Sequence, residues 1–395
     1  MVKKDSSGKL KFPSSQPTLI TRRPCAGSFT YVQDDKILWV NIYIITLKIV
    51  QGERKGGRQS QAERICKFLQ KNVYLWLIIV TKTIVRVRMK GEIEQAIQAE
   101  AQRLGFAACG FARAEAVSEE MTTVLDHWTA SGYHADMQYM ERNRDLRLDP
   151  TQLVPGCQTL IVVALNYYPQ QPLPPEGYQI AYYAYGQDYH RVVKDKLHQL
   201  LSYIKALIPN VEGRAFCDTA PLLERYWAVQ AGLGFIGLNR TLIIPGKGSY
   251  FFLGVLAVNI ALEGEHSAMP TSCGGCKRCL IACPTGALTR EGIDCRRCLS
   301  YLTIEHRGPI PEAMAHSMGR RIYGCDTCQQ VCPHNRHAQP TEESAFTMPA
   351  AVAALTPEEW HSLTPERYKE LFKHSAIERA GYEGLMRNIK TILND

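Results

Sequence analysis

The sequence predicts an α+β fold in which a domain of mixed helices and strands precedes a cysteine-rich domain and a C-terminal helical segment. Apolar runs of strand length at residues 159–165 and 250–258 alternate with helical patterns such as residues 192–208. Nine of the 14 cysteines lie within Cys273–Cys332. Residues 356–395 then read as short helices.

The mixed domain is expected to span residues 89–262. It opens with a helical pattern in which Ile93, Ile97 and Leu104 recur on one face. Gly105 follows where a helix of this length needs a C-terminal cap. The sequence therefore predicts a helix at the start of this domain.

The remaining boundaries follow from composition. Residues 263–340 form the predicted cysteine-rich domain, and residues 341–395 form the helical segment, where Pro357 and Pro365 mark helix starts. Residues 1–88 lack a clear period, and we expect them to be an extension outside the native fold.

The charge of the chain is unevenly distributed. Residues 1–88 hold 17 Lys and Arg against 5 Asp and Glu, whereas the rest of the chain holds 29 against 33. The formal net charge of +8 therefore describes the N-terminal stretch. The body of the protein has no summed charge that would attract a polyanion over long range.

Cysteine usage predicts an intracellular protein, because Cys-x2-Cys runs in a long chain are typical of metal sites in reducing compartments. The apolar stretch Ile37–Val50 is shorter than the ~20 residues that a bilayer requires. Arg22 and Arg23 are followed by Pro24 and no long apolar run, so an export signal is not expected. We expect a cytoplasmic protein with no membrane partner.

The first cysteine run is that of bacterial ferredoxins. Its spacing is Cys273-x2-Cys276-x2-Cys279-x3-Cys283 followed by Pro284. In two-cluster ferredoxins, three thiolates of such a run hold one [4Fe–4S] cluster and the fourth reaches the other cluster. This spacing predicts a ferredoxin-like domain with two clusters.

The second run repeats this pattern without its first cysteine. It reads Cys325-x2-Cys328-x3-Cys332-Pro333, and Ile322 occupies the missing position. Seven ligands are thus present where two clusters need eight. The eighth must come from elsewhere in the chain.

Either Cys295 or Cys298 can complete the set, and spacing alone does not choose between them. Structural zinc is the alternative, because Cys-x2-Cys pairs also bind zinc, although zinc fingers rarely repeat the x3-Cys-Pro ending. The cross-ligation rule assigns one cluster to Cys273, Cys276, Cys279 and Cys332, and the other to Cys283, Cys325, Cys328 and the intervening cysteine.

Several stretches closely resemble the epoxyqueuosine reductase family. They are IDCRRCLSYLTIEHRGPIP at residues 293–311, RIYGCDTCQQVCPHNR at residues 321–336, DTAPLLERYWA at residues 218–228 and AGLGFIGLN at residues 231–239. The resemblance extends over residues 89–395. It implies that Cys298 is the eighth ligand and that Cys295 is a spare buried thiol.

The resemblance also implies an activity. Members of this family reduce epoxyqueuosine to queuosine in the tRNA anticodon, using cobalamin and two [4Fe–4S] clusters. The cobalamin is held in a nitroreductase-like domain, which falls on residues 89–262. The departing epoxide oxygen needs a proton, and by resemblance Asp218 supplies it. We expect burial to raise the pKa of Asp218 so that it holds this proton near neutral pH.

Cofactor-binding residues carry over by position. Those expected to contact cobalamin are Arg142, Tyr189, His190, Asp218, Asn239 and Thr241. For Arg142 a surface ion pair is an equal alternative on sequence alone. His190 could instead be a core histidine satisfied by hydrogen bonds.

The expected macromolecular partner is a tRNA whose anticodon carries epoxyqueuosine, and an external donor must supply electrons. We expect the chain to act as a monomer. The modified base would leave the single-stranded loop and enter a pocket. Candidates for phosphate contacts are Arg296, Arg297, Arg320, Arg321, Lys369, Lys373, Arg387 and Lys390.

Two other functions fit the cysteine pattern. A reductive dehalogenase also combines cobalamin with two clusters, but it typically carries an export leader. A ferredoxin-like electron carrier needs no substrate site. The predicted domain at residues 89–262 argues against the carrier, because a pure electron carrier has no use for a second domain of roughly 170 residues.

Overall fold

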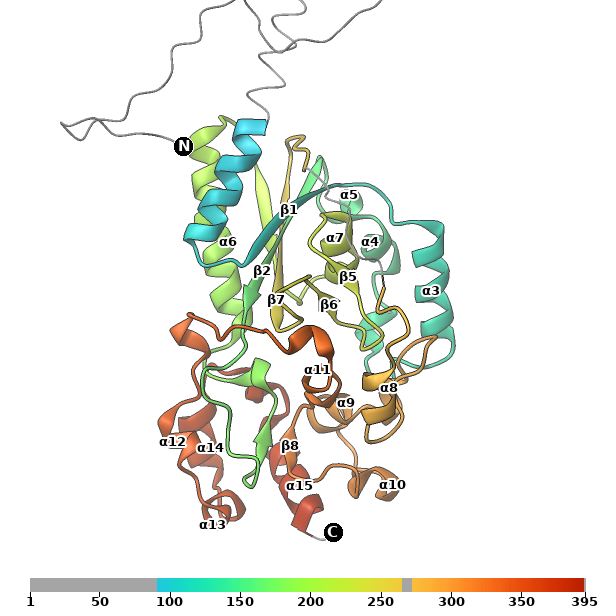
Figure 1. Cartoon of the computed structure of the whole chain (residues 1–395), viewed down its shortest axis with the longest axis vertical. Coiled ribbons are helices and arrows are strands. Elements are labelled where there is room, and N and C mark those ends of the chain that lie inside the picture. The colour runs from blue at the N-terminus through green and yellow to red at the C-terminus, as the bar shows by residue number, and fades with distance from the viewer. Residues whose placement is uncertain (1–90, 265–271, 394–395) are drawn as a thin grey trace, which may run out of the picture. The chain divides into compact units, whose positions relative to one another are not determined.

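The structure is a computed structural model that describes residues 91–264 and 272–393. The extension expected at residues 1–88 lies outside the described residues. Within the described parts, helices and strands are mixed, which agrees with the predicted α+β class (Figure 1). No helix in these parts is long and apolar enough to cross a bilayer.

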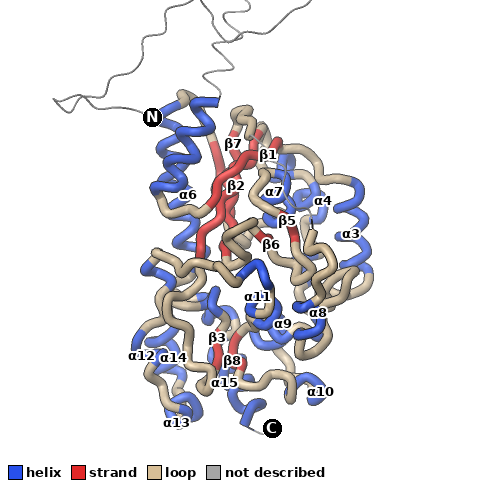
Figure 2. Tube along the Cα trace, viewed as in Figure 1, coloured by secondary structure: helices blue, strands red, loops and turns tan. Residues whose placement is uncertain are grey.

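A four-stranded antiparallel sheet forms the centre of the mixed domain. Its strand order is β1 (Ala108–Arg113), β2 (Thr159–Asn166), β7 (Phe251–Val258) and β4 (Gly213–Phe216). Strands β2 and β7 confirm the two predicted strands. Both are buried along almost their whole length, because helices cover both faces of the sheet (Figure 2).

Two hydrophobic cores lie on the two faces. On one face, α6 (Tyr189–Leu207) and the helix at residues 91–103 pack against Ile161 and Val163. On the other face, Trp227 packs against the side chains of β2 that neighbour Ile161 and Val163 along the strand. This second layer contains α7 (Glu224–Gln230), with α3 (Glu119–Ala130), α4 (Arg144–Leu148) and α5 (Pro150–Leu153) beside it.

Both predicted helices of this domain are present. The helix at residues 91–103 ends before Gly105, whose φ of 92° satisfies the predicted cap. Helix α6 starts three residues earlier than predicted because Asp188 caps it, accepting a hydrogen bond from the His190 N–H at 3.0 Å. This cap places Tyr189 and His190 in the first turn of α6.

The cysteine-rich domain consists of short elements. Helices α8 (Arg278–Ala282) and α11 (Thr327–Gln330), one from each cysteine run, pack against each other. Between them the chain forms η4 (Cys295–Arg297), α9 (Leu299–Ile304), α10 (Glu312–Ala315) and β8 (Arg321–Tyr323). The tertiary fold thus brings the two runs side by side (Figure 1).

The C-terminal segment is helical, and its predicted helix starts are confirmed. Helices α13 (Pro357–His361) and α14 (Pro365–Phe372) both begin at proline, and the preceding threonine caps each of them. Helix α15 (Gly381–Leu393) follows. The segment shares a core with β8 and with β3 (Gln179–Ile180), which pairs with β8 in parallel.

Asn388 connects α15 to the cysteine-rich domain. It is fully buried, and its Nδ2 donates to the carbonyl oxygens of Thr303 and Ile322, both at 2.8 Å. We expect Asn388→Ala to lower the free energy of unfolding by about 1–3 kcal/mol, because two buried carbonyls lose their partner. Urea unfolding would measure this, with Lys390→Ala on the exposed face of α15 as the control. Equal stability of the two variants would contradict the prediction.

Candidate active site and thiol groups

Asp218 lies two residues after the end of β4 and beside the first turn of α6. Its Oδ2 accepts a hydrogen bond from the Tyr189 hydroxyl at 2.5 Å, and the Nε2 of His190 lies 3.5 Å away. The Nδ1 of His190 is 2.6 Å from Asp188 Oδ1. The structure therefore brings together three of the residues that the sequence selected, with Asp188 behind them.

Aromatic packing holds Tyr189 in place. Its ring stacks on Phe252 of β7, with centroids 4.2 Å apart and an interplanar angle of 2°, and on the other side lies the His190 ring at 4.0 Å. The tyrosine hydroxyl is therefore presented to Asp218 by a rigid stack. The side chain of Asp218 is 62% exposed, so it is open to solvent on one side although protein atoms crowd around it.

The charges around His190 favour its protonated form. Burial lowers the pKa of His190, but Asp188 and Asp218 outweigh burial and raise this pKa to about 9. Desolvation raises the pKa of Asp218, but hydrogen bonds from His190 and Tyr189 outweigh it and hold the pKa below its ordinary value. In the protein alone the neighbours thus stabilise the charged form of Asp218, and the raised pKa expected from apolar walls and the corrin stays a prediction.

This protonation has a consequence for stability. The pKa of about 9 for folded His190 lies above the ~6.5 of an unfolded histidine. The ion pairs of His190 therefore contribute stability that is present below about pH 6.5 and is lost as the pH rises through 9. In urea unfolding at several pH values, we expect the stability difference between the parent and His190→Gln to shrink across this window. A difference that grows with pH would contradict the assignment.

Glu224 is a member of this group that the sequence analysis did not select. Its Oε1 accepts a hydrogen bond from the backbone N–H of Asp218 at 2.6 Å. Burial and then the Asp218 carboxylate raise the pKa of Glu224 to about 8. Its position six residues after Asp218, within the stretch at residues 218–228 that carries the family resemblance, is the signal that could have identified it.

The predicted residues Asn239 and Thr241 lie on a hairpin formed by β5 (Phe235–Ile236) and β6 (Leu242–Ile243). Both have a buried polar atom, Asn239 Nδ2 and Thr241 Oγ1, that has no hydrogen-bond partner among the described residues. Such atoms usually have a partner, so a polar ligand at this hairpin would satisfy them. The neighbouring Leu238 N–H points to the Cys273 Sγ at 3.4 Å.

Four cysteines line one small cavity beside this hairpin. These four, which we call the first thiol group, are Cys273, Cys276, Cys279 and Cys332. Leu238 and Asn239 line the same cavity. The four match the set that the cross-ligation rule assigned to one cluster. The hairpin therefore lies directly beside the first thiol group.

Electrostatic interactions identify a second thiol group. Burial raises the pKa of Cys298, and the thiols of Cys325 and Cys283 raise it further. Burial also raises the pKa of Cys328, with added contributions from Cys325 and Cys298. Cys279 of the first thiol group also contributes at Cys328. We call Cys283, Cys298, Cys325 and Cys328, which carry the remaining cysteine interactions, the second thiol group.

Cys295 is placed differently. It is buried and packs against Leu299, Leu302 and Met318. Burial raises its pKa to about 12, and Cys298 is the one cysteine that adds to this shift. Among the described residues, the surroundings of Cys295 are those of a small apolar core residue, whereas Cys298 faces the other thiols of the second group.

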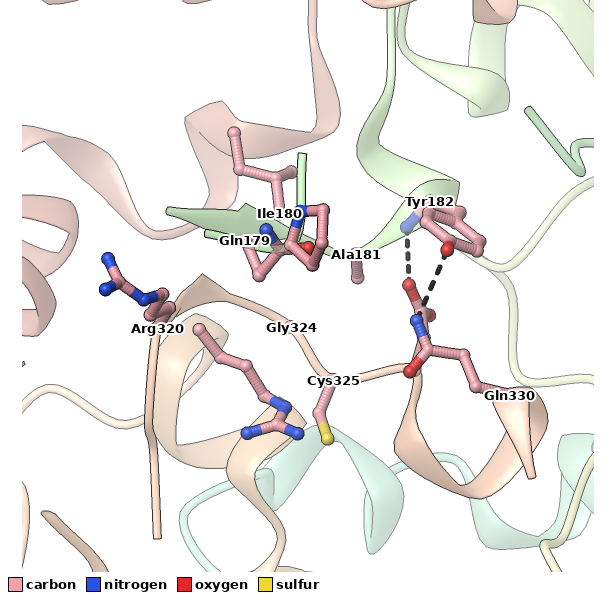
Figure 3. Close-up of a pocket in the computed structure, with 11 residues that line it drawn as sticks. Gln179, Ile180, Ala181, Tyr182, Arg320, Gly324, Cys325 and Gln330 are labelled. Carbon is pink, nitrogen blue, oxygen red and sulfur yellow. Dashed lines mark hydrogen bonds between the residues drawn. The ribbon is translucent and has the colours of Figure 1, made fainter. Parts of the chain in front are cut away.

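A separate cavity of about 200 Å³ lies beside Cys325 (Figure 3). Gln179, Arg320 and Gln330 line it, and the Tyr182 N–H donates to Asp326 Oδ2 at 2.8 Å. None of the cofactor-binding candidates lines this cavity. It therefore belongs to the surface around the second thiol group.

Two of the basic candidates, Arg142 and Arg387, differ in their side-chain contacts. Arg142 is exposed, and within the described residues its side chain makes no hydrogen bond or ion pair, so the surface ion pair that was its alternative is not seen. Arg387 is a structural residue, because its guanidinium donates to the carbonyl oxygens of His306, Gly308 and Leu302. Its role as a candidate for tRNA phosphate stays a prediction.

Two family models match parts of this chain. Residues 147–219, which end just after Asp218, match a family model described as epoxyqueuosine reductase QueG. Residues 272–335 match a 4Fe-4S double cluster binding domain, and this range contains both thiol groups. The chain therefore carries a domain for two [4Fe–4S] clusters.

Curated relatives and solved structures extend the match over most of the chain. The epoxyqueuosine reductase of Cyclobacterium marinum is 42% identical over 76% of this chain and 97% of its own length, and that of Escherichia coli is 36% identical over 77% and 81%. The structure of the Streptococcus thermophilus enzyme has a TM-score of 0.69 at 31% identity, covering 76% of this chain and 80% of that one.

A second solved structure contains a nucleic acid. It is an epoxyqueuosine reductase with an epoxyqueuosine-modified tRNA-Tyr stem loop, which has a TM-score of 0.70 at 27% identity and covers 76% of this chain and 81% of that one. Sequence and structure thus agree over the same three quarters of the chain. This chain belongs to the epoxyqueuosine reductase family.

Proposed function

We propose that this chain reduces epoxyqueuosine to queuosine in the tRNA anticodon, with Asp218 delivering the proton and with cobalamin and two [4Fe–4S] clusters as cofactors. The observation that carries the proposal is the contact of Asp218 with Tyr189 and His190, on a chain with two groups of four cysteines. The chain thus combines a candidate proton donor with thiols that could bind electron-transferring clusters.

The reaction itself sets the requirements. Converting an epoxide to an alkene removes one oxygen atom as water and consumes two electrons and two protons. Iron–sulfur clusters pass electrons singly, so a further cofactor must couple them to the carbon chemistry. Cobalamin, when bound, supplies a cobalt centre that can transfer both electrons to the substrate.

The residues present fit such a cofactor. The unpartnered Nδ2 of Asn239 and Oγ1 of Thr241 offer one donor and one hydroxyl to a polar ligand. With Arg142, Tyr189, His190 and Asp218, these residues would hold the cobalamin. The finer fold assignment, a nitroreductase-like cobalamin domain, is part of the proposal, and the four-stranded sheet with helices on both faces supports it.

Proton delivery follows from the charges at the site. Protonated His190 holds the mobile proton, and its Nε2 faces the ionised Asp218 at 3.5 Å. Asp218 would relay this proton to the departing epoxide oxygen as its C–O bond breaks, while Asp188 retains the imidazole ring. The second proton that forms water would come from solvent on the exposed side of Asp218. The proton thus starts on the histidine and crosses the carboxyl group, in a site open to substrate on the exposed side of Asp218.

The cluster ligands are part of the same proposal. The first thiol group would hold the cluster beside the hairpin that carries Asn239, and the second thiol group would hold the other cluster. An external donor would supply the electrons. The tRNA partner is supported by the relative solved with a modified tRNA stem loop, and a tRNA substrate implies action in the cytoplasm.

Mobility of the aspartate loop is also part of the proposal. The Bacillus subtilis enzyme has been solved with its catalytic aspartate loop swung out of the active site, at 27% identity and a TM-score of 0.70. The corresponding loop here would be residues 217–223, between β4 and α7. Asp218 would then act only when this loop is closed.

One experiment tests the function. The protein is reconstituted anaerobically with iron, sulfide and cobalamin and incubated with tRNA that carries epoxyqueuosine, and mass spectrometry of the digested tRNA follows the loss of 16 Da for the lost oxygen. We expect full conversion to queuosine. Turnover of a chlorinated aromatic without any change in the tRNA would instead support a dehalogenase.

A further inference from the structure

The loop that carries Asp218 turns sharply at that residue. Asp218 has a φ of 59°, and the Thr219 N–H donates to the Cys217 carbonyl oxygen at 2.7 Å, which closes a three-residue turn. A turn of this kind with a positive central φ is the rare, strained form. Such a conformation persists only where the surroundings hold it.

Three side chains hold this turn. The Tyr189 hydroxyl binds the Asp218 carboxylate, and the Lys194 Nζ donates to the Thr219 hydroxyl at 2.9 Å. Glu224 Oε1 accepts from the Asp218 N–H at 2.6 Å. Among the described residues, Glu224 provides the one side-chain contact to the backbone of Asp218.

Glu224 is well placed to close the loop. It is the first residue of α7, directly after the loop, while Cys217 at the other end is fully buried. Leu222 is also buried, and its N–H donates to the Ala220 carbonyl oxygen at 2.8 Å. Both ends of the loop are therefore anchored by buried side chains. The hydrogen bond that Glu224 accepts from the Asp218 N–H holds the backbone between them.

We propose that Glu224 is a positioning residue whose carboxyl group holds the Asp218 backbone in its left-handed turn and so keeps the Asp218 carboxylate against Tyr189 and His190. This inference rests on the proposed role of Asp218 as the proton donor. Glu224 acts through the Asp218 main chain and needs no contact with substrate.

The charge state of Glu224 suits this role. Burial and the Asp218 carboxylate favour its neutral form, whereas the Asp218 N–H, His190 and Arg225 favour the charged form less strongly. A neutral carboxyl group accepts the N–H through its carbonyl oxygen and adds no second negative charge beside Asp218. Glutamine has the same length and the same carbonyl acceptor, so Glu224→Gln is the matched variant.

A simpler role for Glu224 is general stabilisation of α7. An acidic residue in the first turn of a helix is favourable, and Leu223 at the N-cap makes no side-chain hydrogen bond. That role requires Glu224 to be ionised, whereas a glutamine cannot carry the charge but keeps the bond to Asp218. Glu224→Asp keeps the charge but is one methylene too short to reach. The two variants therefore separate the two roles.

The test compares Glu224→Gln, Glu224→Asp and Glu224→Ala in the full chain, reconstituted with clusters and cobalamin. Hydrogen exchange of the peptide spanning residues 216–224 reports the loop, and kcat and KM are measured with epoxyqueuosine tRNA. We expect faster exchange and a kcat about 100-fold lower for the Asp and Ala variants, with KM little changed. Glu224→Gln should stay close to the parent in exchange and kcat.

Two results would overturn the inference. One is Glu224→Asp with parental exchange and parental kcat, and the other is Glu224→Gln as impaired as Glu224→Asp, which would assign the effect to charge. Glu224→Asp and Glu224→Gln decide the matter even if Glu224→Ala does not fold. Failure of the proposed function is distinguishable from failure of this inference. An active Asp218→Asn protein would exclude Asp218 as the proton donor, whereas the hydrogen-exchange comparison of the Glu224 variants would still report whether Glu224 holds the loop.

Discussion

Replacing Asp218 with asparagine is expected to lower the rate of epoxyqueuosine reduction by about 100- to 10,000-fold, the range that loss of a general acid usually produces. Asparagine tolerates the left-handed φ of 59° at this position, so the loop keeps its shape. Its amide oxygen can still accept from the Tyr189 hydroxyl, but it cannot take up the proton of His190. Single-turnover conversion of modified tRNA, followed by mass spectrometry, measures the effect.

The control for this variant is Asp195→Asn on the exposed face of α6, where the carboxylate lies 3.8 Å from Arg191. It removes the same charge away from the site and should keep full activity. Iron, sulfide and cobalamin contents should be equal in both variants. An Asp218→Asn protein that converts tRNA at the parental rate would exclude Asp218 from the mechanism.

The second large effect is expected at the eighth cluster ligand. Cys298→Ser should lower the iron content of the reconstituted chain from about eight atoms toward four, because one cluster loses a thiolate. Cys295→Ser should keep about eight iron atoms, because Cys295 is buried against Leu299, Leu302 and Met318 and belongs to neither thiol group. Iron and sulfide analysis with electron paramagnetic resonance of the reduced protein measures both.

The pair of cysteines makes this test sharp, since the two residues are three positions apart and carry the same substitution. Loss of iron in Cys295→Ser with a full complement in Cys298→Ser would reverse the assignment. Zinc in place of iron and sulfide in the parent protein would overturn both cluster assignments, because a zinc site has no electrons to pass on.

Local sequence patterns predicted the main elements well. The strands at residues 159–165 and 250–258 are long apolar runs, and burial on both faces of the sheet requires that composition. The helix starts at Pro357 and Pro365 depend on the residue itself and its cap. These features were predictable because each depends on neighbours within a few positions.

The protonation of the candidate site was not predictable in this way. Sequence reasoning expected a raised pKa at Asp218, since a carboxyl group near a large apolar cofactor loses solvation. It could not foresee that the cap at Asp188 would aim His190 and Tyr189 at the same carboxylate. Glu224 was missed for a related reason, because its contact is made to a backbone N–H across a tight turn.

The sequence by itself determined the redox chemistry of this protein, because thiolate spacing within Cys273–Cys283 and Cys325–Cys332 is a local property that a short loop imposes on any cluster it binds. The tertiary structure alone gathered Cys273, Cys276, Cys279 and Cys332 around one cavity, packed Cys295 against apolar side chains, and placed Tyr189 and His190 against the Asp218 carboxylate. These outcomes depend on distances between side chains that lie far apart along the chain, and only the packed fold sets such distances.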